Sequence, residues 1–459
     1  MAPDDHSGLS FALGNIAIFP GCDAYDARRI VWNETVDRYP AAICACRTPQ
    51  DVQQVVSHMS QRGGPVSVRG GGHNIAGTAV ADDVVMIDLS DMRQVSVDAE
   101  ARRVRVAGGA TFADVDAATQ KHWLAVAGGV VSSTGVGGLT LGGGIGWLAR
   151  RHGLSIDNLL SAEVVLPGGR RVTVSHQEHS DLFWALRGGG GNFGVVTAFE
   201  FRAHPVGPNV SFGPTFFDLD CAEAVLTAYA QQSQHLPNEA CVWANLMTAP
   251  PSPALPTRWH GKKVLTLMQF HAGPLDAART DLAPLYGGVK PLGSAFAERP
   301  FVEAQRFLDD AYAFGARNHW RTHNHTKLTL GLISTLMDLA ADLPTQASEL
   351  LICQLGGAIQ DVPADATAFA HRHVQCVSTP GVRWQDAGQD AQMIAWLRRA
   401  SERIAEHADP GAYVNFIAEQ SGADIAYQHH MERLRGIKRR YDPNNMFRIN
   451  QNIRPAAPP

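Results

Sequence analysis

A glycine run that ends in a single histidine is the stretch with the clearest capacity for chemistry. Residues 66–77 read VSVRGGGHNIAG, so an alternating, β-branched segment leads into three consecutive glycines and His73. Because glycine lacks a Cβ, such a loop lets backbone N–H groups close on a diphosphate. The imidazole would then lie beside the bound molecule as a nucleophile. The same run also fits a tight turn with a surface histidine, so taken alone it leaves both interpretations open.

Two further glycine clusters follow downstream. Residues 131–148 read VSSTGVGGLTLGGGIGWL, and residues 187–196 read RGGGGNFGVV. Three places without side chains indicate one long, flat ligand lying against backbone. A nicotinamide dinucleotide would need G-x-G-x-x-G between a strand and a helix, with an acidic residue about 20 positions on. Asp157 is too close to serve the second cluster, and the first lacks an acid in register, which disfavours a nicotinamide-linked dehydrogenase.

Composition sets the broad class of the protein. The 459 residues favour two domains, and 45% hydrophobic with 18% charged residues is typical of a soluble globular enzyme. A net charge of −5 gives no reason to expect nucleic acid or membrane partners, and no apolar run approaches the ~18 residues that span a bilayer.

The cysteines and the N-terminal residues favour the cytoplasm. The seven scattered cysteines form no C-x-x-C pair, and Cys44 and Cys46 would share one face of a strand, so we expect buried free thiols. Such thiols fit a reducing compartment. Residues 1–10 are polar and contain acids, unlike a secretory signal. A cytoplasmic location follows as the expectation.

Hydrophobic periodicity places the motifs on elements. In the first part of the chain it predicts strands over 41–46, 66–69, 84–89, 95–97, 104–106, 161–166 and 171–174, an edge-like strand over 195–203, and helices from Pro49 and over 111–124 and 181–186. Composition changes after residues 204–208, which read HPVGP. The middle of the chain then mixes strands over 264–270 and 350–355 with a helix over 391–407, and a charged helix over 427–441 precedes Asp442-Pro443.

Six motifs together resemble a known family. They are VxVRGGGHN (66–74), TGxGGxxxGGGxG (134–146), GLSIDN (153–158), LFWALRGGGGNFGVVT (182–197), YVNF (413–416) and YDPNNxFRxNQNI (441–453). In this order they are similar to FAD-linked oxidoreductases of the vanillyl-alcohol-oxidase type, specifically the berberine-bridge-enzyme-like branch. The resemblance covers most of the chain.

The resemblance implies an α+β fold with a PCMH-type FAD-binding domain of two subdomains. Residues 1–205 and the C-terminal tail 412–459 would form that domain, and an inserted substrate domain of antiparallel sheet plus helices would span residues 206–411. It also implies that His73 bonds covalently to the flavin 8α-methyl carbon. Relatives with two covalent links carry a cysteine where this chain has Val131, so we expect a single link through His73.

The resemblance further implies a set of FAD contacts. These are Arg69, Gly70, Gly71, Gly72, His73, Asn74, Gly77, Thr134, Gly135, Gly138, Gly142, Gly143, Gly146, Asn158, Gly191, Gly194, Val196, Tyr413, Asn415 and Asn450.

The activity implied is an oxidase with molecular oxygen as the second substrate. A small aromatic, alkaloid or polyketide-like molecule would give a hydride to flavin N5, and O2 would reoxidise the flavin to yield H2O2. Thr134 would lie where oxygen enters, although it also fits a simple turn residue. Gln354 precedes Gly356-Gly357 on a strand where the family often has a catalytic glutamate or glutamine, although a core glutamine is the alternative.

The resemblance leaves two candidates for the base of the reaction. Phe416 stands where sugar oxidases of the family have a tyrosine base, so Tyr413 or Gln354 would have to compensate. An oxygen-excluding flavin dehydrogenase, a sugar or alcohol oxidase and a non-catalytic flavin-binding protein remain alternatives. Substrate identity and oligomeric state stay open.

Histidines and aromatics of the middle region are further candidates for a site. His319 and His323 would be one helical turn apart, but no carboxylate or thiol lies nearby in sequence to complete a metal site, and His371 and His373 read the same way. No metal is expected. The aromatics Trp243, Tyr312, Phe314 and Trp320 could line an aromatic pocket or simply form core.

Overall fold

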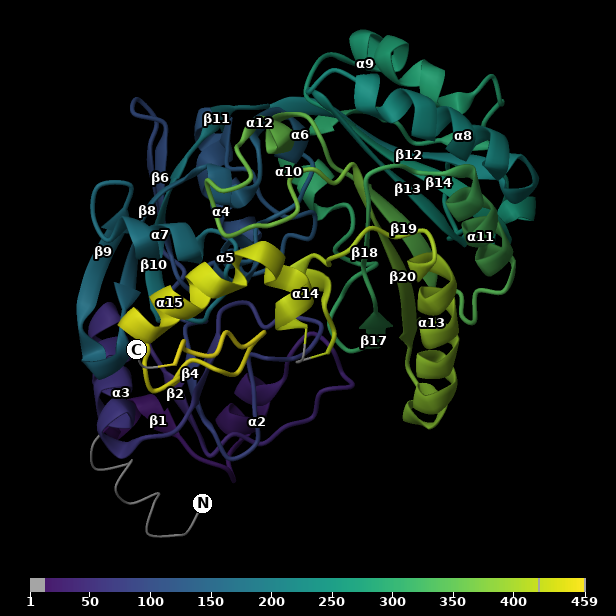
Figure 1. Ribbon diagram of the computed structural model, residues 1–459. Coiled ribbons are helices and arrows are strands. Elements are labelled where there is room, and N and C mark those ends of the chain that lie inside the picture. Colours follow the sequence, from purple (N-terminus) through teal and green to yellow (C-terminus); the bar gives the residue numbers. More distant parts are fainter. Residues whose placement is uncertain (1–12, 420–421, 458–459) are drawn as a thin grey trace.

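The computed structural model describes residues 13–419 and 422–457, and three sheets organise the chain (Figure 1). The expectation about residues 1–10 therefore lies outside the described residues. The first two sheets and the C-terminal helices occupy one side of the molecule, and the largest sheet with its helices occupies the other (Figure 1).

The first sheet leads into the histidine-bearing loop. Its strand order is β1-β2-β4-β3, with bounds Ala17–Ile18, Ala42–Ala45, Val85–Asp88 and Val66–Arg69. Helix α3 (Pro49–Arg62) begins at a capping box between Thr48 and Asp51, with proline at its first position. Cys44 and Cys46 face one core with the buried side of α3, which confirms that they share a face.

The second sheet supports the third glycine cluster. Its order is β5-β6-β10-β8-β9, with bounds Val95–Asp98, Arg103–Ala107, Val195–Arg202, Leu159–Val165 and Arg171–Ser175. The prediction that residues 195–203 form an edge-like strand is wrong, because β10 pairs with β6 on one side and β8 on the other. Val195 packs into one core and Phe199 into another, so both faces of β10 are covered. Strands β7 (Leu124–Ala125) and β11 (His204–Pro205) form a small separate pair.

The third sheet is antiparallel and has nine strands. Its path is β15-β12-β14-β13-β19-β20-β17, with bounds Gly293–Ser294, Asn209–Asp218, Lys263–His271, Ala240–Thr248, Glu349–Gln354, Cys376–Trp384 and Arg317–Trp320, while β16 (Ala297–Pro300) pairs with β12 and β18 (His323–His325) pairs with β20. Helices α8 (Ala222–Gln232), α9 (Leu275–Leu282), α11 (Leu330–Ala341) and α13 (Asp390–Ala405) lie along one side of this sheet (Figure 1). The other face is left for the site.

Shorter helices connect these sheets, and the C-terminal tail returns to the first two. The connecting helices are α2 (Asp23–Arg29), α4 (Phe112–Thr119), α5 (Val136–Leu141), α6 (Ala149–His152), α7 (Ser180–Leu186), α10 (Phe301–Arg306) and α12 (Ala358–Asp361). In the tail, the helix predicted over 427–441 begins only at Met431, as α15 (Met431–Tyr441), since Gln428 has a φ of 42°. A separate short helix, α14 (Ala423–Tyr427), precedes it. Leu434 and Ile437 of α15 pack against the second sheet's core. The domain boundaries at 205 and 411 stay predictions.

Candidate active site

One elongated cavity lies between the glycine loops and the open face of the third sheet. Its volume is about 1190 Å³, above the range of about 300–1,000 Å³ typical of small-molecule pockets. It can therefore hold a dinucleotide and a second small molecule. Many of the predicted FAD contacts line it, namely Gly70, Gly71, Gly72, His73, Asn74, Thr134, Gly135, Gly138, Gly191, Gly194, Val196, Tyr413, Asn415 and Asn450.

The glycine loops form a cradle made of backbone. Gly71 and Gly135 approach so closely that a Cβ on Gly71 would lie 2.4 Å from the Gly135 nitrogen. Gly138 and Gly191 line the cavity, and a Cβ on either would meet no protein atom within 4 Å. Within the described residues, the backbone N–H groups of 70–74 donate to no protein acceptor. Free N–H groups around a space cleared of side chains fit the diphosphate of a dinucleotide.

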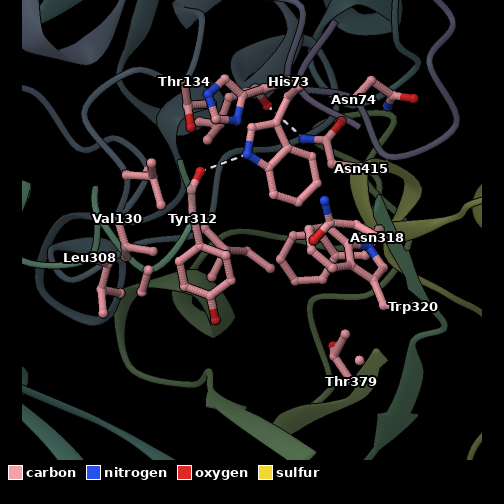
Figure 2. Close-up of a pocket in the computed structure, with 18 of the residues that line it drawn as sticks. His73, Asn74, Val130, Thr134, Leu308, Tyr312, Asn318, Trp320, Thr379 and Asn415 are labelled. Atoms are coloured by element: carbon pink, nitrogen blue, oxygen red, sulfur yellow. Dashed lines mark hydrogen bonds between the residues drawn. The ribbon is translucent and has the colours of Figure 1, made fainter. Parts of the chain in front are cut away.

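His73 stands at one end of this cradle, among aromatic rings (Figure 2). Its Nε2 lies 2.8 Å from the Ser133 hydroxyl, and its ring stacks on Trp32 with a centroid distance of 5.6 Å. Phe314 contacts it edge-on at 5.1 Å. Burial lowers the pKa of His73 to about 4, so the imidazole is neutral near pH 7 and one ring nitrogen keeps a lone pair.

Tyr413 and Asn415 of the tail reach the second glycine cluster. The Tyr413 hydroxyl accepts from Gly144 N–H at 3.1 Å and from Asn415 Nδ2 at 2.9 Å. Burial raises the Tyr413 pKa, so the phenol is protonated near pH 7. A Cβ on Gly142 would lie 2.1 Å from Asn415 Oδ1, so Gly142 makes room for that amide without lining the cavity itself.

Five other predicted FAD contacts also lie behind the cavity wall. Arg69, Gly77, Gly143, Gly146 and Asn158 are absent from the lining. The Asn158 amide donates to the carbonyls of His152 and Leu154, and a Cβ on Gly146 would lie 1.8 Å from the Gly128 oxygen. These residues do not line the cavity, and their contact with FAD stays a prediction.

Gln354 does not face the cavity. Its Oε1 accepts from Val242 N–H at 2.7 Å and its Nε2 donates to the Ser233 carbonyl, with 2% of the residue exposed. Both ends of the amide are therefore used by backbone. The geometry does not support the expected catalytic role, and the alternative of a core glutamine accounts for it.

Thr134 and Val131 lie on the wall beside His73. Thr134 lines the cavity close to the imidazole (Figure 2), and its backbone carbonyl accepts from Phe112 N–H. Val131 lines the same wall and offers only methyl groups. The role of Thr134 in oxygen entry stays a prediction.

The opposite wall is the open face of the third sheet, and only part of it could be predicted from the sequence. Trp243, Tyr312 and Trp320 line the cavity, as one of the two interpretations of these aromatics predicts. Polar residues that no sequence motif indicates also line this wall, namely Asn245, Asn318, Glu349, Thr379 and Arg383. Alternation along the strands places such residues on one face, but it does not say which face the helices cover.

The histidines of the middle region do not form the arrangement that their spacing suggested. His319 lies on β17 and His323 on β18, so no helical turn relates them. The His323 Nε2 lies 2.9 Å from the Ser401 hydroxyl. Across residues 13–419 and 422–457, no group of three His, Cys, Asp or Glu residues could hold a metal ion.

The described thiols are all free, as expected, but not all are buried. Cys22 and Cys221 are exposed, whereas the other five are buried. In the described part of the chain no helix is both long and apolar enough to cross a bilayer.

Several buried histidines make stability depend on pH. Burial lowers the pKa of His152 to about 3 and those of His204, His323 and His371 to about 4, below the unfolded value near 6.5. The unfolded chain then binds more protons, so the free energy of unfolding should fall by several kcal/mol as pH drops from about 6.5 toward 4.

Urea unfolding at pH 7.0, 5.5 and 4.5 would measure this loss. His323→Gln should weaken the pH dependence, and His122→Gln, at an exposed position, should leave it unchanged. Equal stability at the three pH values would contradict the prediction.

Comparisons with known proteins agree with this geometry. Residues 40–175 match an FAD binding domain, and residues 412–454 match the family described as berberine and berberine like. An FAD-linked oxidoreductase of Bacillus subtilis is 29% identical over 94% of this chain and 95% of its own. The (R)-6-hydroxynicotine oxidase of Paenarthrobacter nicotinovorans is 28% identical over 96% of each chain.

Solved structures show the same fold. The crystal structure of 6-hydroxy-D-nicotine oxidase from Arthrobacter nicotinovorans matches with a TM-score of 0.85 and 25% identity, over 96% of this chain and 98% of that one. Berberine bridge enzyme from Eschscholzia californica matches with a TM-score of 0.87 and 21% identity over 99% of each chain. The expected α+β, PCMH-type fold is confirmed.

The fold, the cradle and these matches define an oxidoreductase that uses FAD. The chain is similar to the berberine-bridge-enzyme-like oxidoreductases in its FAD binding domain, residues 40–175, and in its C-terminal residues 412–454.

Proposed function

We propose that this protein is an FAD-dependent oxidase whose cofactor is covalently attached through His73 alone. The observation that carries the proposal is a neutral imidazole placed at the end of a backbone cradle, with Nε2 beside the Ser133 hydroxyl. If Nε2–H donates to that oxygen, Nδ1 keeps the lone pair and becomes the linking atom. Val131 has no nucleophile, which supports one link rather than two.

The cavity-lining residues that are predicted to contact FAD would hold it there. Backbone N–H groups of 70–74 would bind the diphosphate, and Tyr413 with Asn415 would approach the ring system from the tail. When bound, FAD supplies a hydride acceptor at N5 that O2 reoxidises with release of H2O2. The chain's own task is to orient a substrate against that position and to exclude water.

The substrate we propose is a small aromatic, alkaloid or polyketide-like molecule. Trp243, Trp320 and Phe416 line the space between His73 and the sheet, and flat rings pack well on such side chains. The name of the Paenarthrobacter relative, a hydroxynicotine oxidase, supports a heteroaromatic substrate. Phe416 has no phenol, which argues against a tyrosine base acting on simple sugars or alcohols.

The rate at which the reduced flavin is reoxidised in air distinguishes an oxidase from the dehydrogenase alternative. The protein would be photoreduced without oxygen and then mixed with air-saturated buffer while flavin absorbance and peroxide are followed. Reoxidation within seconds and one H2O2 per flavin would support the oxidase. Reoxidation over many minutes would support the dehydrogenase alternative. A flavin that no small aromatic tested can reduce would favour the non-catalytic alternative.

Ser133 should matter for attachment of the cofactor. In Ser133→Ala the imidazole loses the contact that orients Nδ1, so we expect the covalently bound fraction to fall by about tenfold soon after synthesis. Intact mass spectrometry of denatured protein measures that fraction. Ser132→Ala is the matched control, because Ser132 bonds Asp309 instead of His73. Equal covalent fractions in all three proteins would contradict this role for Ser133.

A further inference from the structure

A partly buried carboxyl group lies on the face of the third sheet that lines the cavity. Glu349, at the start of β19, accepts hydrogen bonds from the Tyr312 hydroxyl and from Asn245 Nδ2. All three residues line the cavity. Burial raises the pKa of Glu349, while its two hydrogen bonds favour the ionised form. Both neighbours donate, so each carboxylate oxygen still has a lone pair for a further donor.

A guanidinium lies beside this carboxyl group. Glu349 pairs with Gly381 across β19 and β20, so Arg383, two positions on, is its diagonal neighbour. Arg383 donates from Nη2 to the Ala313 carbonyl at 2.6 Å and holds its Cζ 5.7 Å over the Trp32 ring. Its charge acts on Glu349, yet its buried Nη1 has no partner.

Several other buried polar atoms of this face also lack a partner. They are Asn245 Oδ1, Thr266 Oγ1, Trp320 Nε1 and Thr379 Oγ1, all from cavity-lining residues. A buried polar group without a partner costs about 1–3 kcal/mol, so a folded protein seldom keeps several together without a ligand or water. This cluster therefore indicates a polar end to whatever the cavity binds.

We propose that Glu349 and Arg383 form the substrate-anchoring site, and that it selects aromatic ligands that present a polar hydrogen to Glu349. An oxygen next to that hydrogen would accept from Arg383. The inference rests on the proposed function, since it names the polar group that the substrate of that site must carry. Glu349 is a specificity-determining residue in this account.

Tyr312 sets the orientation of such a ligand. Its backbone carbonyl accepts from Trp32 Nε1 at 2.6 Å, and Trp32 stacks on His73. Its ring extends from there away from His73 (Figure 2) and ends at Glu349. One residue thus spans the distance from the cofactor end to the carboxyl group. A ligand anchored at Glu349 would direct its aromatic body toward His73.

Calorimetric titration of the yellow holoenzyme tests the anchor without turnover. The probes are naphthalene, 2-methoxynaphthalene, 2-naphthol and 2-naphthylmethylammonium, which share one ring system and differ in acceptor and donor. We expect at least one donor probe to bind about tenfold tighter than 2-methoxynaphthalene. Preference for the hydroxyl or for the ammonium probe identifies which donor the site takes.

Variants assign that preference to Glu349. In Glu349→Leu, the ratio of the affinity for the donor probe to the affinity for 2-methoxynaphthalene should fall to about one. Glu349→Gln keeps one acceptor oxygen and should give an intermediate ratio. Glu223→Gln, on the exposed side of α8, should keep the wild-type ratio. An unchanged ratio in Glu349→Leu, or no donor preference in the yellow wild type, would overturn the inference. A colourless wild type would instead count against the proposed function.

Discussion

Replacing His73 by alanine should abolish covalent attachment of the flavin. His73 is the nucleophile of the proposed link, and the methyl group of alanine cannot form a bond to the cofactor. The backbone cradle of residues 70–74 persists, so FAD should still bind reversibly. The purified variant should therefore lose its colour to the supernatant when it is precipitated with acid, whereas the wild type should keep its colour in the pellet.

Two controls accompany this variant. His122→Ala changes an exposed histidine outside the cavity and should keep its colour in the pellet. Circular dichroism of His73→Ala should match the wild type, because loss of the fold would release flavin for another reason. Pigment that stays with acid-precipitated His73→Ala protein would show that another residue carries the link.

Replacing Lys438 by methionine should destabilise the protein by about 3–5 kcal/mol. Lys438 is fully buried on α15, and its Nζ contacts Asp442 Oδ2 at 2.6 Å, the Asn192 carbonyl at 2.6 Å and the Phe447 carbonyl at 2.9 Å. The variant leaves the Asp442 carboxylate buried without its cation. Asn192 belongs to the third glycine cluster, so the variant also loses the hydrogen bond that connects α15 of the tail to that cluster.

Denaturant unfolding measures this loss. Arg435→Met, on the exposed side of the same helix, removes only a surface pair with Asp424 at 3.8 Å and should change stability by less than about 1 kcal/mol. The covalent link should form less efficiently in Lys438→Met, because the glycine loops are held less firmly. The FAD content of this variant after dialysis should therefore fall. Equal unfolding midpoints for both variants would contradict the role given to Lys438.

The glycine-rich half of the site could be predicted because its signal is local. Backbone contact between Gly71 and Gly135 leaves no room for a Cβ at either position. Glycine is therefore required at both, and this requirement is visible in the sequence itself. The strand–loop order around His73 follows from β-branched alternation in 66–69. Most residues predicted to touch FAD accordingly line the cavity.

The substrate half could not be predicted in the same way, since it depends on which face of a sheet is open. Gln354 and Glu349 lie on one strand, but Gln354 is occupied by backbone partners and Glu349 faces the cavity. Alternation along 349–354 places the two residues on opposite faces, but it does not say which face is open, because the helices that close one face come from distant parts of the chain. The assumed helical spacing of His319 and His323 failed for a related reason: long-range pairing with β20 makes both segments strands.

The intact mass of the denatured wild-type protein tests the central claim most directly. A bond between the imidazole and the flavin methyl carbon removes one hydrogen from each, so the account predicts a mass above that of the polypeptide by one FAD less two hydrogens. The added mass should map to the peptide that contains His73. A mass equal to the polypeptide alone, from a preparation that was yellow before denaturation, would contradict the account.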